Sequence, residues 1–154
     1  IIDPHGKAWW IHGQPHRISA PAIKYKNGDE SYYENGKLHR IGGPAVRRGD
    51  TEEYYEDGRR HRIGGPAVDS PTVKQYYWKG LLHCEDGPAE EYEFGDVRYW
   101  KYGKRHRIGG PAVIVHNSRE EYWVDGELHC EDGPAIRRAN GRAEYWLHNV
   151  RIGV

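Results

Sequence analysis

A seven-residue pattern, His-x-x-x-Gly-Pro-Ala, recurs along the chain at an almost constant interval, and this recurrence limits the possible folds more than any other feature. Complete copies begin at His39, His61, His83, His106 and His129. A degenerate copy begins at His16, where Ala20 replaces the glycine. The successive histidines lie 23, 22, 22, 23 and 23 residues apart. An interval this regular predicts a tandem array of one small structural unit.

Each unit contains two turn signals, which predict two strands per unit. The first turn is clearest at Asn35-Gly36 and Asp57-Gly58, and the second at Asn27-Gly28. Asn-Gly and Asp-Gly reach the positive φ angles of type I′ hairpins at little cost. Aromatic and β-branched residues between the turns favour strands, and no segment has a sustained helical period.

We therefore expect an all-β fold, an elongated single-layer antiparallel sheet of about 6.5 tandem β-hairpin repeats that is curved or twisted. Residues 1–154 form one array. Its units lie near 7–28, 29–50, 51–72, 73–95, 96–118 and 119–141, with a half unit at 142–154. Because proline has no N–H for a ladder hydrogen bond, Gly42-Gly43-Pro44 and its equivalents should form a bulge or corner between strands.

The sequence resembles the MORN repeat family, in particular the variant repeats of bacterial antitoxin-like and viral proteins. The resemblance lies in Tyr-Tyr-Glu-Asn-Gly-Lys at 32–37, in Tyr-Tyr-Glu-Asp-Gly-Arg at 54–59 and in their counterparts. It covers nearly the whole chain and implies consecutive antiparallel hairpins in one curved sheet. The His-x-x-x-Gly-Pro-Ala half departs from the commonest motif, in which a second Gly-x-aromatic element is expected. For function, the resemblance implies an inhibitor, an antitoxin-like or counter-defence factor, or a scaffold.

Pairs of adjacent aromatic residues precede the hairpin turns and should present one ring to each face of the sheet. The pairs are Trp9-Trp10, Tyr32-Tyr33, Tyr54-Tyr55, Tyr76-Tyr77, Tyr99-Trp100, Tyr122-Trp123 and Tyr145-Trp146. Aliphatic residues are few, so we expect most of the buried area to come from these rings. Either both rows of rings hold the array together, or one row stays exposed for binding.

The histidines that occur once per repeat are predicted to be structural. We expect each to hydrogen-bond a backbone group that the Gly-Pro corner leaves free, and ligand contact is the alternative. The row comprises His16, His39, His61, His83, His106 and His129.

Neither a metal site nor a disulfide is expected. His83-Cys84-Glu85-Asp86 and the equivalent segment at 129–132 contain ligand residue types but lack the tetrahedral set that zinc requires. Cys84 and Cys130 are two units apart, which places them roughly 20 Å from each other if each unit adds two strands. That distance is too long for a bridge.

Charge differs between repeats, and this variation is expected to determine the specificity for a partner. Basic residues flank the histidine in most units, whereas Glu85-Asp86, Glu127 and Glu131-Asp132 make two units acidic. A charge-banded edge of this kind can select one partner, or it can simply keep the edge soluble. The predicted partner-binding residues are Arg60, Arg62, Trp100, Arg105, Arg107 and Trp123.

The overall charge makes nucleic acid and membrane unfavoured partners, since 23 basic and 23 acidic residues give no net charge. No apolar run is long enough for a membrane span or a signal-peptide core, so we expect a cytoplasmic protein; a leader before Ile1 stays an open alternative.

Sequence motifs of phosphate-binding loops, zinc proteases and serine hydrolases do not occur, and an open sheet favours binding over catalysis. We therefore expect no catalytic residue and no cofactor. The first hypothesis is a binding module for a partner protein. The alternatives are a receptor that sequesters a nucleotide-like or other anionic small ligand and, with less support, a membrane-associated scaffold. The end strands could also join two copies in a homodimer.

Overall fold

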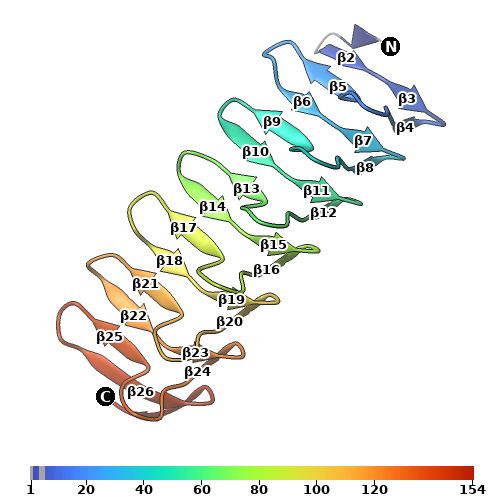
Figure 1. The fold of residues 1–154 in the computed structure, drawn as a ribbon. Helices are drawn as coiled ribbons and strands as arrows, with labels where there is room; N and C mark the ends of the chain where they lie inside the picture. Colours follow the sequence, from blue (N-terminus) through green and yellow to red (C-terminus); the bar gives the residue numbers. More distant parts are fainter. Residues whose placement is uncertain (1, 4–5) are drawn as a thin grey trace. The chain divides into compact units, whose positions relative to one another are not determined.

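The computed structural model describes the backbone of residues 2–3 and 6–154, with side chains from Gly6 onward. It contains two compact units, Ile1–Gly80 and Leu81–Val154. Each is built from consecutive antiparallel β-hairpins, and no helix occurs in the described residues, which confirms the predicted all-β hairpin-repeat fold (Figure 1). Accordingly, the described part of the chain has no helix that is long and apolar enough to cross a membrane.

In the first unit, one antiparallel sheet carries the repeats and three short hairpins extend from it. The sheet order is β1 (Ile2–Asp3), β2 (Gly6–Ala8), β5 (Ile23–Tyr25), β6 (Glu30–Ser31), β9 (Val46–Arg48), β10 (Thr51–Glu53), β13 (Val68–Asp69) and β14 (Val73–Gln75). The short hairpins pair β3 (Trp10–Ile11) with β4 (Gln14–Pro15), β7 (Tyr33–Glu34) with β8 (Lys37–Leu38), and β11 (Tyr55–Glu56) with β12 (Arg59–Arg60). Strand β15 (Tyr77–Trp78) follows β14.

The second unit repeats this plan. Its sheet order is β17 (Glu90–Tyr92), β18 (Val97–Arg98), β21 (Val113–Val115), β22 (Arg119–Glu121), β25 (Ile136–Arg138), β26 (Ala143–Leu147) and β27 (Val150–Gly153). Strand β16 (Leu81–Leu82) opens the unit. The short hairpins pair β19 (Trp100–Lys101) with β20 (Lys104–Arg105), and β23 (Trp123–Val124) with β24 (Glu127–Leu128).

A full repeat contains four strand segments instead of the two that the turn signals predicted. Between β8 and β9 the chain forms the predicted Gly-Pro corner and makes no strand pairing. The ladder resumes at Ala45, directly after the proline. Its N–H donates to the carbonyl of Glu53 at 2.8 Å, and its carbonyl accepts from the N–H of Tyr32 at 2.7 Å. Proline therefore costs no ladder bond, because the residue after it supplies both.

The first turn of each repeat has the type I′ geometry that its dipeptides predict. Asn35 and Gly36 have φ angles of 49° and 75°, and Asp57 and Gly58 have φ angles of 49° and 77°. Lys79 adopts the same left-handed conformation, with φ of 48°, although lysine is poorly suited to it.

The fully buried side chains are small, whereas the aromatic rings, from which the sequence analysis expects most of the buried area, are less completely buried. Val46 and Val113 are each 2% exposed, and no ring among residues 6–154 is as buried. Each Gly-Pro-Ala corner brings its chain so close to the neighbouring strands that only a methyl group fits. The corner alanines, all with 0% exposure, are Ala22, Ala45, Ala67, Ala89, Ala112 and Ala135.

Enlarging a corner alanine should destabilise the protein. We expect Ala112→Leu to lower the free energy of unfolding by about 1–3 kcal/mol, because the added carbons have no space and must displace packed backbone. Urea unfolding measures the change. The same substitution at Ala139, an exposed turn residue, is the control and should change stability by less than about 0.5 kcal/mol. Equal effects at the two positions would show that the corner is not tightly packed.

Candidate functional site

Five of the six repeat histidines bind the hairpin turn of the following repeat. His39 Nδ1 accepts a hydrogen bond from the N–H of Asp57 at 3.2 Å, and His106 Nδ1 accepts one from Asp125 at 3.1 Å. Equivalent bonds join His16 to Asn35, His61 to Lys79 and His129 to His148. The first residue of a two-residue hairpin turn has no partner for its N–H within its own hairpin, and the histidine supplies one. The backbone partner is thus at this turn, and not at the Gly-Pro corner as expected.

His83 differs from the other five. Its ring stacks on Tyr102, with a distance of 4.0 Å between ring centres and an angle of 17° between ring planes. Its Nδ1 is buried without a hydrogen-bond partner, and its Nε2 lies 3.4 Å from the carboxylate of Glu85.

Arg62 and Arg107, both predicted to bind a partner, fold back onto their own corners. Arg62 Nη1 donates to the carbonyl of Pro66 at 3.0 Å, and its guanidinium lies 3.8 Å from the centre of the Tyr54 ring. Arg107 makes the same two contacts, with Pro111 at 3.1 Å and the Tyr99 ring at 3.9 Å. Each arginine therefore combines a charge-assisted hydrogen bond with a cation–π contact.

The glycine before each proline belongs to this arrangement. A Cβ atom at Gly65 would lie 3.1 Å from the guanidinium carbon of Arg62, and one at Gly110 would lie 3.1 Å from that of Arg107. The Gly-Pro pair thus leaves space for the folded-back arginine.

Arg60 lies between two aromatic rings and beside a buried carboxylate. Its Nη2 donates to Glu53 Oε2 at 2.9 Å and its Nε to Tyr55 Oη at 3.1 Å. The ring centres of Tyr55 and Tyr77 are 5.9 and 5.5 Å from its guanidinium. Burial alone would lower the pKa of Arg60, but the hydrogen bonds with Glu53 and Tyr55 outweigh burial and hold the pKa above its usual range.

Arg105, Trp100 and Trp123 form a similar cluster in the second unit. The guanidinium of Arg105 lies 5.3 Å from the Trp100 ring centre and 5.1 Å from that of Trp123. The indole Nε1 of Trp100 donates to Glu90 at 2.8 Å, and that of Trp123 donates to Glu121 at 2.9 Å. All six predicted partner-binding side chains are therefore half-buried and have contacts inside the fold. Their role in partner binding stays a prediction.

Each segment between a repeat histidine and its Gly-Pro pair is called a corner loop, and the arginine that follows the histidine is called the corner arginine. Several corner loops expose an isoleucine that the sequence analysis did not single out. It follows the corner arginine, and its side chain is 73% exposed at Ile18, 86% at Ile41 and 78% at Ile63 in the first unit. In the second unit Ile108 is 73% exposed. A signal for these residues was present in the sequence, since each is an isolated apolar side chain in a segment predicted to leave the sheet. It lies between an arginine and a glycine at Ile41, Ile63 and Ile108, and between an arginine and a serine at Ile18.

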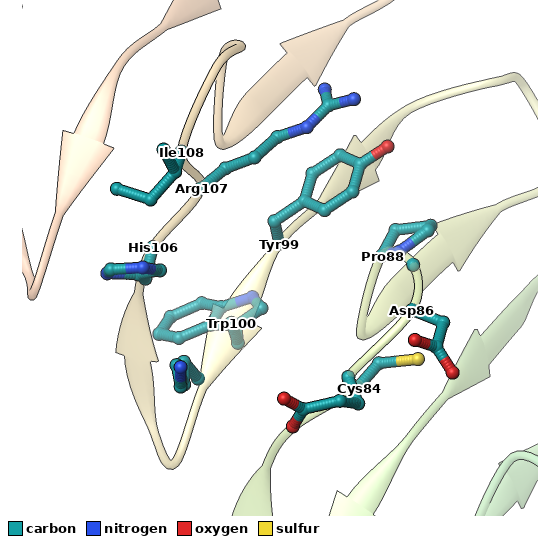
Figure 2. A pocket seen from close by; sticks show the side chains of 11 residues that line it. Cys84, Asp86, Pro88, Tyr99, Trp100, His106, Arg107 and Ile108 are labelled. Atoms are coloured by element: carbon teal, nitrogen blue, oxygen red, sulfur yellow. The ribbon is translucent and has the colours of Figure 1, made fainter.

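A groove lies beside the corner loops in each unit. In the first unit it measures about 440 Å³, and it is lined by the Arg40–Gly43 and His61–Ile63 loop segments and by Tyr54 and Tyr55. In the second unit the equivalent groove measures about 460 Å³. Figure 2 shows Tyr99 and Trp100 on one side of this groove and Cys84, Asp86 and Pro88 on the neighbouring loop.

Two corners of the second unit are acidic. Glu85 and Glu131 replace the corner isoleucine, and their side chains are 68% and 78% exposed. Cys84 and Cys130 replace the corner arginine, and both are free cysteines. In the last full repeat the guanidinium of Arg137 lies 5.1 Å from the ring centre of Tyr122, the ring that a corner arginine would otherwise cover.

No group of three or more histidine, cysteine or carboxylate side chains suited to holding a metal ion occurs within the part of the chain that the structure describes.

Comparison of the chain with protein-family models and with curated proteins gives no match in either case. The resemblance to MORN repeats therefore stays an inference from the motif residues.

The contacts of the folded-back corner arginine should contribute to the free energy of unfolding. We expect Arg62→Ala to lower the free energy of unfolding by about 1–2 kcal/mol, because it removes a hydrogen bond to Pro66 and the cation–π contact with Tyr54. Arg59→Ala removes an equal charge from an exposed position of β12 and is the matched control. Chemical denaturation of both variants measures the free energy of unfolding. If both substitutions lower it by a similar small amount, the contacts of Arg62 with Pro66 and Tyr54 do not stabilise the fold, and its side chain is available to a partner.

Proposed function

We propose that the chain is a non-catalytic binding module that engages a partner protein through its corner loops. The observation that carries this proposal is the exposed isoleucine of Ile18, Ile41 and Ile63 in three successive repeats, and again of Ile108. An inhibitor or antitoxin-like factor that covers part of its target would act through such a surface.

The isoleucines support the proposal because burial within the fold does not account for them. The arginine beside each isoleucine is held by a proline carbonyl and a ring, whereas the isoleucine side chain points away from the packed core with more than two thirds of its surface exposed. Exposed apolar side chains gathered in one region are typical of interaction sites. An apolar side chain that recurs at the same exposed position is best explained by an external contact.

The grooves make the surface beside the isoleucines concave. Ile41 and Ile63 stand on the two loops beside the groove of the first unit, and Tyr54 and Tyr55 also line it. Apolar and aromatic side chains around a concave surface can hold an anchoring side chain of a partner, which is how most interface free energy is concentrated. The charge band contributes specificity, since Glu85 and Glu131 replace the isoleucine at two corners.

The alternative function, a receptor for an anionic small ligand, requires arginine side chains that are free to bind it. Arg60 is paired with Glu53, and Arg62 and Arg107 are bound to proline carbonyls. These contacts favour a partner protein over an anionic ligand.

The triple variant Ile18→Ser, Ile41→Ser and Ile63→Ser tests the proposal. We expect it to keep the thermal unfolding temperature of the wild type and to bind a captured partner at least about 10-fold more weakly, because three apolar side chains no longer leave water on binding. The partner is first captured from the native source with the wild-type chain, and its affinity is then measured by calorimetry.

Phe94→Ser is the control, because Phe94 is an apolar side chain, 81% exposed, in the turn between β17 and β18 and not in a corner loop. It should bind the partner like the wild type. Unchanged affinity in the triple variant, or the absence of any partner captured by the wild-type chain, would contradict the proposal.

A further inference from the structure

The glycine before the corner proline borders a space that a guanidinium group occupies in several repeats. A Cβ atom at this glycine would lie close to the guanidinium carbon of the corner arginine, at 3.0 Å for Gly43 and at 3.1 Å for Gly65 and Gly110. In the same three repeats, Nη1 of the corner arginine donates to the carbonyl of the proline at 3.0–3.1 Å. We call the glycine and the proline carbonyl of a corner its guanidinium site.

The last full repeat fills its guanidinium site although the corner arginine is missing. Cys130 replaces that arginine, yet a Cβ atom at Gly133 would lie 3.2 Å from Nη2 of Arg137. Arg137 belongs to β25, which follows the corner, and its guanidinium lies over the Tyr122 ring, 5.1 Å from the ring centre. A guanidinium group therefore reaches the same position from a different point of the sequence, which indicates that the position itself favours this group.

The corner of residues 84–88, called the Cys84 corner, leaves its guanidinium site open. Apart from its two chain neighbours, a Cβ atom at Gly87 would have a single heavy atom within 4 Å among the residues that the structure describes, the Sγ atom of Cys84 at 3.9 Å. Glu91 stands at the position that corresponds to Arg137 in the last full repeat, so β17 supplies no guanidinium group either. The space beside Gly87 and the carbonyl of Pro88 is therefore unfilled.

The surroundings of this open site are acidic and concave. Gly87 and Pro88 line the groove of about 460 Å³ in the second unit, together with Cys84, Glu85 and Asp86 of the same loop. Both carboxylate residues are exposed. A guanidinium group carries five N–H donors in one plane and binds carboxylates and carbonyls through charge-assisted hydrogen bonds. The Cys84 corner thus offers a guanidinium group both the carbonyl that holds it elsewhere and negative charge beside it.

The cations that line this groove do not occupy the site. Arg107 donates to the carbonyl of Pro111 and lies 3.9 Å from the centre of the Tyr99 ring, and Figure 2 shows it beside that ring. Lys101 is an exposed residue of β19. Neither side chain comes within 4 Å of a Cβ atom at Gly87. The site is therefore accessible to a group from outside the chain.

We propose that the Cys84 corner binds a guanidinium group from outside the chain, and that an arginine side chain of the partner protein supplies it. The guanidinium donates to the carbonyl of Pro88, as the corner arginine does in other repeats, and pairs with the carboxylate of Glu85 or Asp86. The binding of a guanidinium group is independent of the isoleucine surface, whereas the identity of its donor rests on the proposed function.

The first test uses N-acetyl-arginine amide as a probe, titrated into the full chain and followed through the backbone amide signals by NMR. We expect saturable shifts at Gly87 and none at Gly65 or Gly110, whose sites are filled. N-acetyl-citrulline amide has nearly the same shape without the charge and should bind at least about 5-fold more weakly. No saturable shift at Gly87, or equal affinity for the two probes, overturns the proposal.

Three single substitutions fill or open the site. Cys84→Arg supplies the guanidinium group from the chain itself and should abolish the response of Gly87 to the probe. Cys130→Arg is the matched control, because Arg137 already fills that corner, and it should leave the response of Gly87 unchanged. Arg137→Ala should open the second site, so that the amide of Gly133 responds to the probe as well. A response of Gly87 that persists in Cys84→Arg overturns the proposal.

A double variant covers the case in which Cys84→Arg does not fold. Glu85→Gln with Asp86→Asn removes both exposed carboxylates of the loop and should weaken binding of the arginine probe at least about 5-fold. An unchanged affinity for the probe in this double variant counts against the proposed site as plainly as a persistent response does.

The captured partner distinguishes this proposal from the proposed function. Cys84→Arg, or the double variant in its place, should bind the partner at least about 10-fold more weakly, because the arginine of the partner loses its site. Unchanged affinity for the partner shows that its arginine is not the donor and overturns that assignment. If the wild-type chain captures no partner, the proposed function fails, while the probe titration still decides whether the Cys84 corner binds a guanidinium group.

Discussion

The Gly-Pro-Ala corner is the constraint on which the rest of the structure depends. Its alanine donates to a strand of the next repeat and accepts from the first aromatic residue of its own repeat, and it has no exposed surface. The proline stands directly before the residue at which the ladder resumes, and the glycine leaves room for the arginine that covers the corner. Packing, ring positions and loop exposure all follow from this one arrangement, repeated within each unit.

Much of the fold could be predicted because it depends on the conformational preferences of short sequence segments. The hairpin turns at Asn35-Gly36 and Asp57-Gly58 follow from the φ angles that these residues tolerate, and the corner follows from proline. The nature of the core could not be predicted in this way. Rings are the largest apolar side chains in the sequence, but only the packing of neighbouring chains at the corner shows that Ala67 is fully buried while Tyr54 is not.

The candidate site was harder to predict, because its contacts join different repeats. His39 was recognised as structural from its recurrence, but its partner, the amide of Asp57, is 18 residues away and becomes a neighbour only when two hairpins lie side by side. The contacts of the arginines could not be predicted for a related reason. From sequence, Arg62 is an exposed charge beside a loop, whereas in the structure it is turned back by Pro66 and Tyr54.

The corner isoleucines have no comparable contact assigned to them, and most of their surface is exposed. Ile41 and Ile63 lie in loops that the fold needs for their glycine, proline and arginine, yet their own side chains contact solvent. At Glu85 and Glu131 the same position is acidic, and the arginine before it is a cysteine. The glycine before the proline, the proline and the alanine are thus kept at these two corners, while the arginine and the outward-facing isoleucine are both replaced.

Native-state hydrogen exchange at the corners tests the central claim most directly. If the corner alanine holds the repeats together, the amides of Ala45, Ala67 and Ala112, each hydrogen-bonded to the next repeat at 2.8 Å, should be among the most protected in the protein. The amides of Gly42, Gly64 and Gly109 in the same loops should exchange rapidly. Alanine amides that exchange as fast as those of the neighbouring glycines would contradict the account.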